Sequence, residues 1–463
     1  MRARYTVILA LLLVALGAYL YFVESKHIAA EGKKDRVLTL VPEDATRITL
    51  TYPDGSEVAL DLREGSWRLT KPVDAVADDI TVKGLLRTIA DTEVVKTIDD
   101  PPADLAQFGL AEPMVTVTVT AKDQVLPALK VGKKTTVSSL TYAQRADQAK
   151  IFLAGAGFHN GMDKHFKDFR DKTIITFKDD DIAALTMSGP GGAVELRKRD
   201  GTWMIEQPVA TRADDSTIRS LLSTIRGMRA EDFANDNPTP ADLAAFGLDQ
   251  PEREIVLRDT ADKERRLQFG KESDQGLYVK VADRPTAFIV GTWASRDLGK
   301  SLGELRDKTV LQFDPAAVGS IQVRRSDGEA FTVLHTDDAW AVDGATGASE
   351  TGKIKTFVDA LAHLKGSRVL SDKPEDLRFY GLAAPTVTIA VIGKDGSALG
   401  TVRVGTKPPD EEGKGTTRYT ATRENDTVIA ELFGYQFNQL NQKKENFLPG
   451  SAAPTPGATA AAG

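Results

Sequence analysis

The sequence contains no cysteine, which excludes several kinds of chemistry at once. Disulfide cross-links, thiolate metal sites, a cysteine nucleophile and a lipid attached to cysteine all require this residue. Histidine is scarce, with five residues, so few side chains could act as a base near neutral pH. A G-x-S-x-G motif is absent, which leaves a serine hydrolase of that class without a nucleophile. We therefore expect a protein that is not an enzyme, without catalytic, cofactor-binding or metal-binding residues.

The chain also lacks an excess of basic charge. Lys and Arg total 59 against 66 Asp and Glu, for a net charge of -7. Nucleic-acid-binding proteins usually carry a basic footprint, so we expect no nucleic-acid partner. Hydrophobic residues make up 41% and charged residues 27%, as in ordinary globular proteins. At roughly 100 to 200 residues per domain, 463 residues favour about three domains.

One long apolar run lies at the amino terminus. Residues 5–23 carry no charge, and as a helix they would span roughly 28 Å, enough to cross a bilayer. A cleaved signal peptide is the alternative, but its small-residue exit at residues 15–17 is poor and more apolar residues follow. Positive charges flank both sides, so charge alone does not fix the orientation. The short basic tail favours an uncleaved signal anchor whose following domains are exported.

Three similar segments follow the apolar run. Trp67, Trp203 and Trp340 are spaced by 136 and 137 residues, in REGSWRL, RDGTWMI and TDDAWAV. Gly109, Gly247 and Gly381 recur in PADLAQFGLAEP, PADLAAFGLDQP and PEDLRFYGLAAP. A period this long indicates complete domains and not solenoid repeats. We predict an anchor and linker (1–36), three repeat domains (37–172, 173–308 and 309–449) and a disordered tail (450–463).

Each copy is predicted to be an α+β domain with a mainly antiparallel sheet. Turn dipeptides such as Asp54-Gly55 separate strands of a three-stranded meander. An amphipathic helix follows, with apolar residues at i, i+3, i+4 and i+7. Its predicted N-caps are Asp79, Asp215 and Thr351. Alternating strands come next, and a terminal helix closes the copy, with the predicted apolar stripes Phe158, Met162, Phe166 and Phe169, then Trp293, Leu298, Leu302 and Leu305.

The FGL motif predicts a helix stop. A short helical turn would begin at Pro102, Pro240 or Pro374 and end at a left-handed glycine. Asp104, Asp242 and Asp376 would lie in its first turn. These glycines and the three tryptophans are interpreted as structural, because a tryptophan at a fixed strand position is usually core; ligand-stacking platforms are the alternative.

Charged triplets close the first two copies and are the candidate partner contacts. They are Arg170-Asp171-Lys172 and Arg306-Asp307-Lys308, with a structural role at a domain joint as the other reading. The third copy has Lys443-Lys444-Glu445 at the expected place. His159, Asp163 and His165 form the densest candidate metal cluster, but Ser295, Gly299 and Ser301 replace them 136 residues later. We interpret this cluster as a solvated helix face.

Tandem FGL-x-x-P and LRDKT elements behind one amino-terminal span resemble the bacterial domain-of-unknown-function 4340 family. The resemblance covers roughly residues 37–447. It implies a single-pass inner-membrane protein with periplasmic domains, often encoded beside gliding-motility-type ABC transporter components, and no established enzymatic activity. We expect a non-enzymatic scaffold or accessory protein of an envelope complex, whose partners are the membrane, envelope proteins and ABC transporter subunits. A cell-wall or carbohydrate-binding module is the alternative, followed by an envelope hydrolase that would need a pocket peculiar to one copy.

Overall fold

The computed structural model describes residues 35–101, 104–337, 339–345, 347–407 and 417–450. The predicted anchor at 5–23 and the tail from 451 onward lie outside these residues. In the part that is described, no helix has the length and apolar character needed to cross a membrane. The chain divides into two compact units, residues 1–173 and 174–463, which are described separately below.

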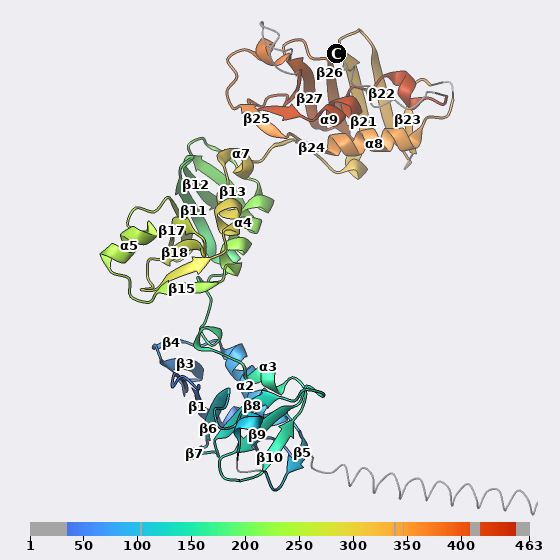
Figure 1. Cartoon of the computed structure of the whole chain (residues 1–463). Helices are drawn as coiled ribbons and strands as arrows, with labels where there is room; N and C mark the ends of the chain where they lie inside the picture. The colour runs from blue at the N-terminus through green and yellow to red at the C-terminus, as the bar shows by residue number, and fades with distance from the viewer. Residues whose placement is uncertain (1–34, 102–103, 338, 346, 408–416, 451–463) are drawn as a thin grey trace, which may run out of the picture. The chain divides into compact units, whose positions relative to one another are not determined.

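Unit 1 holds the first copy and builds one antiparallel sheet (Figure 1). Its elements are η1 (Pro42–Asp44), β1 (Ala45–Thr51), β2 (Glu57–Arg63), β3 (Ser66–Lys71), β4 (Ala75–Val76), α2 (Asp79–Asp91), β5 (Val94–Ile98), η2 (Ala106–Phe108), β6 (Val115–Ala121), β7 (Gln124–Val125), β8 (Leu129–Lys134), β9 (Thr141–Arg145), β10 (Ile151–Ala154), α3 (Phe158–Met162) and η3 (Phe166–Asp168). The strand order is β4-β3-β2-β1-β6-β8-β9-β10-β5, with β7 beside β6. Two meanders therefore meet at β1 and β6, and α2 connects the two outer edges.

Unit 2 holds the second and third copies, whose elements repeat this order. Copy 2 has η4 (Asp179–Asp181), β11 (Ile182–Gly189), β12 (Gly192–Arg199), β13 (Thr202–Gln207), β14 (Thr211–Arg212), α4 (Asp215–Gly227), β15 (Asp232–Asn235), α5 (Pro240–Phe246), β16 (Arg253–Asp259), β17 (Glu264–Ser273), β18 (Gly276–Val281), β19 (Ala287–Val290), α6 (Trp293–Leu298) and α7 (Leu302–Leu305). Its sheet runs β14-β13-β12-β11-β16-β17-β18-β19-β15, which is the order of copy 1 without the small β7.

Copy 3 keeps the same sheet with one strand fewer at its edge among the residues described. Its elements are β20 (Thr309–Gln312), η5 (Pro315–Ala317), β21 (Val318–Arg325), β22 (Ala330–Thr336), β23 (Ala339–Val342), α8 (Thr351–Ala362), β24 (His363–Lys365), β25 (Arg368–Ser371), η6 (Leu377–Tyr380), β26 (Val387–Gly393), β27 (Ala398–Lys407), β28 (Arg418–Arg423), β29 (Ile429–Leu432), α9 (Gly434–Leu440) and η7 (Lys444–Phe447). The order is β23-β22-β21-β26-β27-β28-β29-β25, and β20 pairs with β24. The expectation of mainly antiparallel sheets with helices is confirmed in all three copies.

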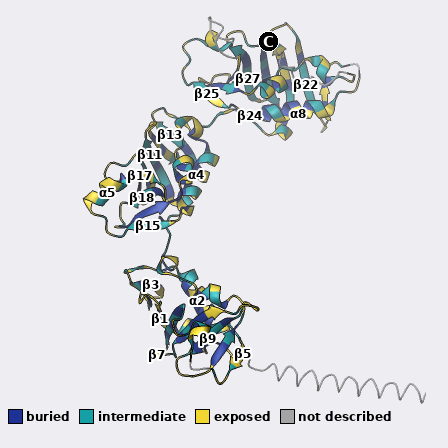
Figure 2. Cartoon of the chain, viewed as in Figure 1, coloured by how far each residue is buried: buried dark blue, intermediate teal, exposed yellow. Residues whose placement is uncertain are grey.

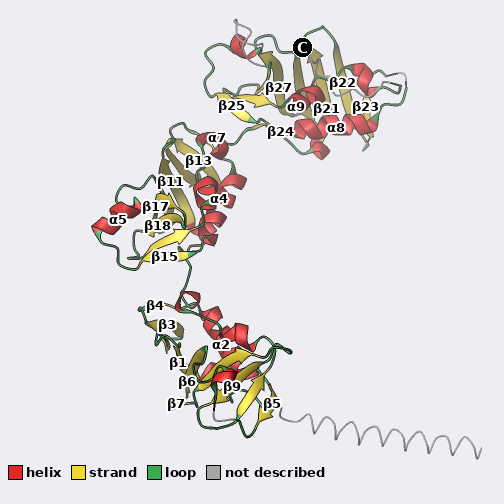
Figure 3. Cartoon of the chain, in the orientation of Figure 1, coloured by secondary structure: helices red, strands yellow, loops and turns green. Residues whose placement is uncertain are grey.

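Three apolar clusters fill the copies. They comprise buried residues between 37 and 169, between 174 and 305, and between 310 and 447. In each copy the predicted amphipathic helix presents its apolar stripe to the sheet; in copy 2 the stripe is Ile218, Leu221, Leu222 and Ile225. Figure 3 shows α4 lying along its sheet, and Figure 2 shows the exposed α5 beside buried strands. The clusters follow the predicted repeat, and the exact domain boundaries stay a prediction.

The helix N-caps lie one residue earlier than predicted. Asp78 and Asp214 have extended backbones and accept hydrogen bonds from Thr81 N and Thr217 N, while Glu350 makes no side-chain cap in copy 3. The predicted residues are instead the first helical ones. Asp79 and Asp215 accept the backbone N–H of the repeated tryptophan, at 3.0 and 3.1 Å in copies 1 and 2. The two adjacent aspartates therefore have separate roles: the first caps the helix, and the second accepts a hydrogen bond from the strand that holds the tryptophan.

The predicted terminal helix is broken in two in copies 1 and 2. α3 ends before Asp163 and η3 resumes after His165, while α6 ends before Gly299 and α7 begins with a capping box between Ser301 and Glu304. Reading the stripe as one helix was therefore wrong. Trp293 also departs from it, because 37% of the residue is exposed. Short caps interrupt the apolar period, and each fragment contributes its own buried side chains.

Candidate functional site

The repeated tryptophans belong to the cores. Trp67, Trp203 and Trp340 are 2%, 4% and 6% exposed, so their rings are not open stacking platforms. The residue opposite each tryptophan on the neighbouring strand differs between copies: Leu62, Lys198 and His335. The tryptophan is thus a fixed part of the fold, and its cross-strand neighbour is the variable one.

The FGL glycines are left-handed, as predicted. Gly109, Gly247 and Gly381 have φ of 67°, 69° and 67°. The lead-in differs from the prediction, because Pro240 opens the true helix α5 whereas Pro374 precedes a shorter 3-10 turn, and Pro102 lies outside the described residues. Asp242 sits inside α5, but Asp104 and Asp376 precede their turns and accept the backbone N–H two residues on.

A second glycine ladder was missed by the sequence analysis. Gly132, Gly270 and Gly405 lie on the strands beneath the FGL turns, where a Cβ would stand 2.2 to 2.3 Å from a backbone oxygen of residue Phe108, Phe246 or Gly381. No side chain can occupy such a space without moving the backbone. The ladder repeats at about the same period in VGK, FGK and VGT, a signal that could have revealed it.

The triplet at the end of copy 2 forms part of a joint with copy 3. Arg306 is 6% exposed and donates from its guanidinium to Asp372, with one bond of 2.9 Å. Burial lowers the pKa of Arg306. The Asp307 carboxylate accepts Thr309 N at 3.0 Å, and Lys308 Nζ donates to Gly303 O at 3.0 Å. The triplet is engaged with this chain, and contact with another protein stays a prediction.

A second ion pair crosses the same joint. Lys365 of copy 3 donates to Asp214, the N-cap of α4 in copy 2. Burial raises the pKa of Asp214, but hydrogen bonds from Lys365, Ser216 and Thr217 outweigh it and hold this pKa far below its usual range. The Gly366 N–H also donates to Lys308 O at 2.8 Å. Copies 2 and 3 are thus linked by charges on both sides of one short connection.

The equivalent triplet in copy 1 has the same local arrangement. Arg170 is 5% exposed, with its guanidinium carbon 5.9 Å from the centre of the Phe166 ring. The Asp171 carboxylate accepts Thr173 N at 2.9 Å, as Asp307 does for Thr309 in copy 2. Lys172 is half-buried. Arg170 and Arg306, the first residues of the two triplets, are therefore both buried.

Copy 3 does not carry the triplet where the sequence placed it. In each copy one carbonyl near the end of that copy accepts the N–H of the helix N-cap: Phe169 O for Asp78, Leu305 O for Asp214 and Phe447 O for Glu350. Leu448-Pro449-Gly450 therefore stands at the triplet's position, and matching Lys444 to Lys172 and Lys308 was wrong. Lys444 begins the terminal turn η7 instead. The spacing misled because copy 3 is longer than its predecessors.

The candidate metal ligands of copy 1 are spread over separate surroundings. His159 lies in α3, where burial and Lys134 lower its pKa and its Nδ1 has no partner. His165 stacks on Tyr52 with ring centres 5.5 Å apart. Burial, with smaller contributions from nearby aspartates, raises the pKa of Tyr52 to about 12. Among the residues described, no three His, Asp or Glu side chains come together as metal ligands.

A cleft of copy 2 lies between α4 and the strands β12 and β13, the second of which holds Trp203. Its volume is about 790 Å³, within the range of roughly 300 to 1,000 Å³ usual for ligand sites. Trp203 and Leu222 supply the apolar part of its lining. Charged and hydroxyl side chains surround this apolar part: Lys178, Asp179, Asp180, Lys198, Asp215, Arg219, Ser220, Ser223 and Arg226. Sequence reasoning did not find this site, because it searched for residues that recur.

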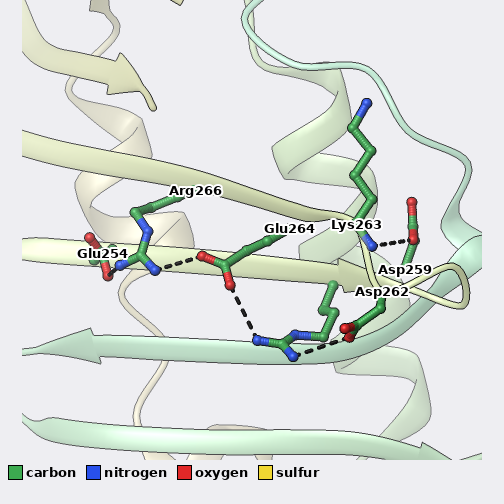
Figure 4. A network of polar contacts seen from close by, with 7 residues as sticks. Glu254, Asp259, Asp262, Lys263, Glu264 and Arg266 are labelled. Carbon is green, nitrogen blue, oxygen red and sulfur yellow. Dashed lines mark hydrogen bonds and ion pairs between the residues drawn. The ribbon is translucent and has the colours of Figure 1, made fainter. Parts of the chain in front are cut away.

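The outer face of the copy 2 sheet is covered by exposed ion pairs. Arg266 contacts both Glu254 and Glu264 at 2.6 Å, and Arg258 contacts Glu264 and Asp262 (Figure 4). Such pairs are worth about 0 to 1 kcal/mol each. This face is therefore polar, and both of these arginines are paired with carboxylates.

Comparison with protein families gives one match, repeated three times. The model described as Domain of unknown function (DUF4340) matches residues 67–239, 203–370 and 340–452. Each match begins at a repeated tryptophan, and the first two extend into the helix or strands of the following copy. No curated protein and no solved structure matches the chain.

Proposed function

This chain belongs to the DUF4340 family, and we propose that it is a non-enzymatic scaffold or accessory protein of a bacterial envelope complex. In this proposal residues 5–23 anchor it in the inner membrane and three homologous α+β domains lie in the periplasm. Its partners are envelope proteins, with ABC transporter subunits as the first candidates. Family membership by itself supplies no activity, so the proposal rests on how the chain is built.

The observation that carries the proposal is the joint between copies 2 and 3. Two ion pairs, Arg306 with Asp372 and Asp214 with Lys365, connect the copies, and one member of each pair is almost fully buried. Charges are expensive to bury, so a pair of them favours one arrangement of the two copies over others. A scaffold needs such an arrangement, because its partners bind at set positions. The residues that recur in all three copies, tryptophan and glycine, are also those of folding.

Crosslinking and co-purification of the full-length protein from membranes test this function. We expect the wild type to retain envelope proteins, and the variant Arg306→Glu to retain less of them because the joint is broken. Lys263→Glu is the matched control, since Lys263 is exposed in the same copy and its side chain is outside the joint. Equal recovery with all three proteins would contradict a role for the joint, and recovery of no partner would contradict the scaffold.

Location is tested separately. A periplasm-active reporter enzyme fused after Gly463 should be active, and the protein should stay in the membrane fraction after alkaline washing. A soluble, trimmed product would contradict the anchor. The enzymatic alternative is tested by His159→Ala combined with His165→Ala, which should leave partner recovery unchanged; loss of function in a folded, membrane-bound variant would favour a hydrolase instead.

A further inference from the structure

The cleft of copy 2 is lined mainly by charged and hydroxyl side chains around a small apolar part. Its apolar part consists of Trp203 and Leu222, both of which belong to the core. Ser220 and Ser223 are exposed on α4 and line the same space. Hydroxyl groups and a small apolar surface beside charged groups can hold a polar organic molecule in one orientation.

Some charged side chains of the cleft have partners within the protein, and others do not. Arg226 pairs with Asp179 at 3.5 Å, Arg219 Nε donates to Asp215 O, and the Asp215 carboxylate accepts Trp203 N. In the described part of the chain, Lys178 and Lys198 make no side-chain hydrogen bond or ion pair. Lys178 and Lys198 therefore line the cleft without an ion pair, and Asp179 is the lining carboxylate that is paired with a cation in the described part of the chain.

The same positions in the other copies show that the fold does not require these cations. Lys178 precedes the first 3-10 turn of copy 2, where copy 1 has Val41 and copy 3 has Asp314. Lys198 lies across from the tryptophan, where Leu62 and His335 stand. At the position of Arg226 on the helix, both other copies have alanine, Ala90 and Ala362. Lys178, Lys198 and Arg226 therefore have no cation at their equivalent positions, whereas Arg219 has Lys83 and Lys355 at its own.

We propose that this cleft binds an oligosaccharide that carries carboxylate or phosphate groups. Lys178 and Lys198 bind the anionic groups, because a charged donor and acceptor make the strongest hydrogen bonds available to either. Ser220, Ser223 and the Asp180 carboxylate bind sugar hydroxyls, which both donate and accept. The volume of the cleft exceeds what a lone inorganic anion would fill. This proposal is independent of the scaffold function and does not require it.

Binding is measured by calorimetry on the full-length protein in nanodiscs of zwitterionic lipid, so that the membrane supplies no competing anion. Three probes are titrated: tetragalacturonic acid, a maltotetraose that carries a phosphate group, and neutral maltotetraose. We expect one or both anionic probes to bind, more weakly as salt is raised, and maltotetraose to bind at least about tenfold more weakly. Preference for one anionic probe identifies carboxylate or phosphate as the natural group.

Variants assign the binding to the cleft. The double variant Lys178→Val with Lys198→Leu introduces the residues of copy 1, and it should lose at least about tenfold in affinity. Lys263→Leu removes one exposed cation of copy 2 outside the cleft and should bind as the wild type does. If the double variant lowers the unfolding temperature, Lys178→Gln with Lys198→Gln replaces it. Equal binding of neutral and anionic probes, equal loss in the control, or no binding of any probe overturns the proposal.

Discussion

Copies 2 and 3 share the order of their common strands and the same glycine turns. They differ at their last residues and in the residue opposite the tryptophan. Copy 2 ends in Arg306-Asp307-Lys308 and joins the next copy, whereas copy 3 ends in Leu448-Pro449-Gly450. Copy 2 has Lys198 beside its tryptophan, and copy 3 has His335 stacked on Trp340 with ring centres 4.1 Å apart. Recurring residues build each copy, and the residues that change between copies determine what each copy contacts.

The largest effect is expected at the glycines that both copies share. Gly270→Val and Gly405→Val should each destabilise their own copy by about 3 kcal/mol or more, because a Cβ there meets a backbone oxygen at 2.2 or 2.3 Å. Hydrogen exchange read by mass spectrometry reports each copy separately. The control Gly201→Ala has positive φ but open space around it, so it should cost only about 1 kcal/mol. If the control loses as much stability as the valine variants, the contact between the Cβ and the backbone oxygen is not the cause of the destabilisation.

A smaller effect is expected at the joint, which distinguishes the end of copy 2 from the end of copy 3. Breaking a fully buried ion pair costs about 3 to 5 kcal/mol, and the partial exposure of Asp372 reduces this to about 1 to 3 kcal/mol for Arg306→Ala. Protection of β24 and β25 against hydrogen exchange should fall. Arg306→Asp combined with Asp372→Arg should restore part of it. Leu448→Ala, at the equivalent place in copy 3, should leave the protection of β24 and β25 unchanged. A fall in that protection would refute the assignment of the joint to Arg306 and Asp372.

The joint is also expected to depend on pH, through Asp214. Its pKa is held low in the folded protein, against about 3.9 for an unperturbed aspartate. The bond to Lys365 therefore contributes fully above about pH 4 and is lost progressively as the pH falls toward the folded-state pKa. Exchange protection around Lys365 should be constant from about pH 7 to 5 after correction for intrinsic exchange, and should fall below about pH 4. Asp214→Asn should lower the exchange protection at neutral pH and abolish its fall below about pH 4. If the protection of this variant still falls in acid, a group other than Asp214 causes the pH dependence.

Periodic features of the sequence predicted the fold well, because burial repeats at fixed spacing. The helix stripe of α4, the meander turns and the left-handed FGL glycines all follow from local patterns. The helix caps were displaced by one residue because two adjacent aspartates could each cap, and only the backbone distinguishes them. The triplet of copy 3 was misplaced because spacing was used where hydrogen bonds define equivalence. The cleft was missed since two of its cations, Lys178 and Lys198, come from separate elements and have no cation at the equivalent positions of the other copies.

The smallest effects are expected at the position opposite the repeated tryptophan, which is Lys198 in copy 2 and His335 in copy 3. They distinguish a side chain available to a ligand from one that stabilises the fold. Lys198→Leu should change the stability of copy 2 by no more than about 0.5 kcal/mol, since Leu62 occupies this place in copy 1. Among the residues described, Lys198 also makes no side-chain hydrogen bond or ion pair that the substitution would remove. His335→Leu should cost copy 3 about 1 kcal/mol, because the Nδ1–H of His335 donates to Val318 O at 2.9 Å and its ring stacks on Trp340. Urea unfolding followed by copy-resolved hydrogen exchange measures both. If Lys198→Leu is as costly as His335→Leu, Lys198 is held by the fold, and its availability to an anionic ligand is refuted.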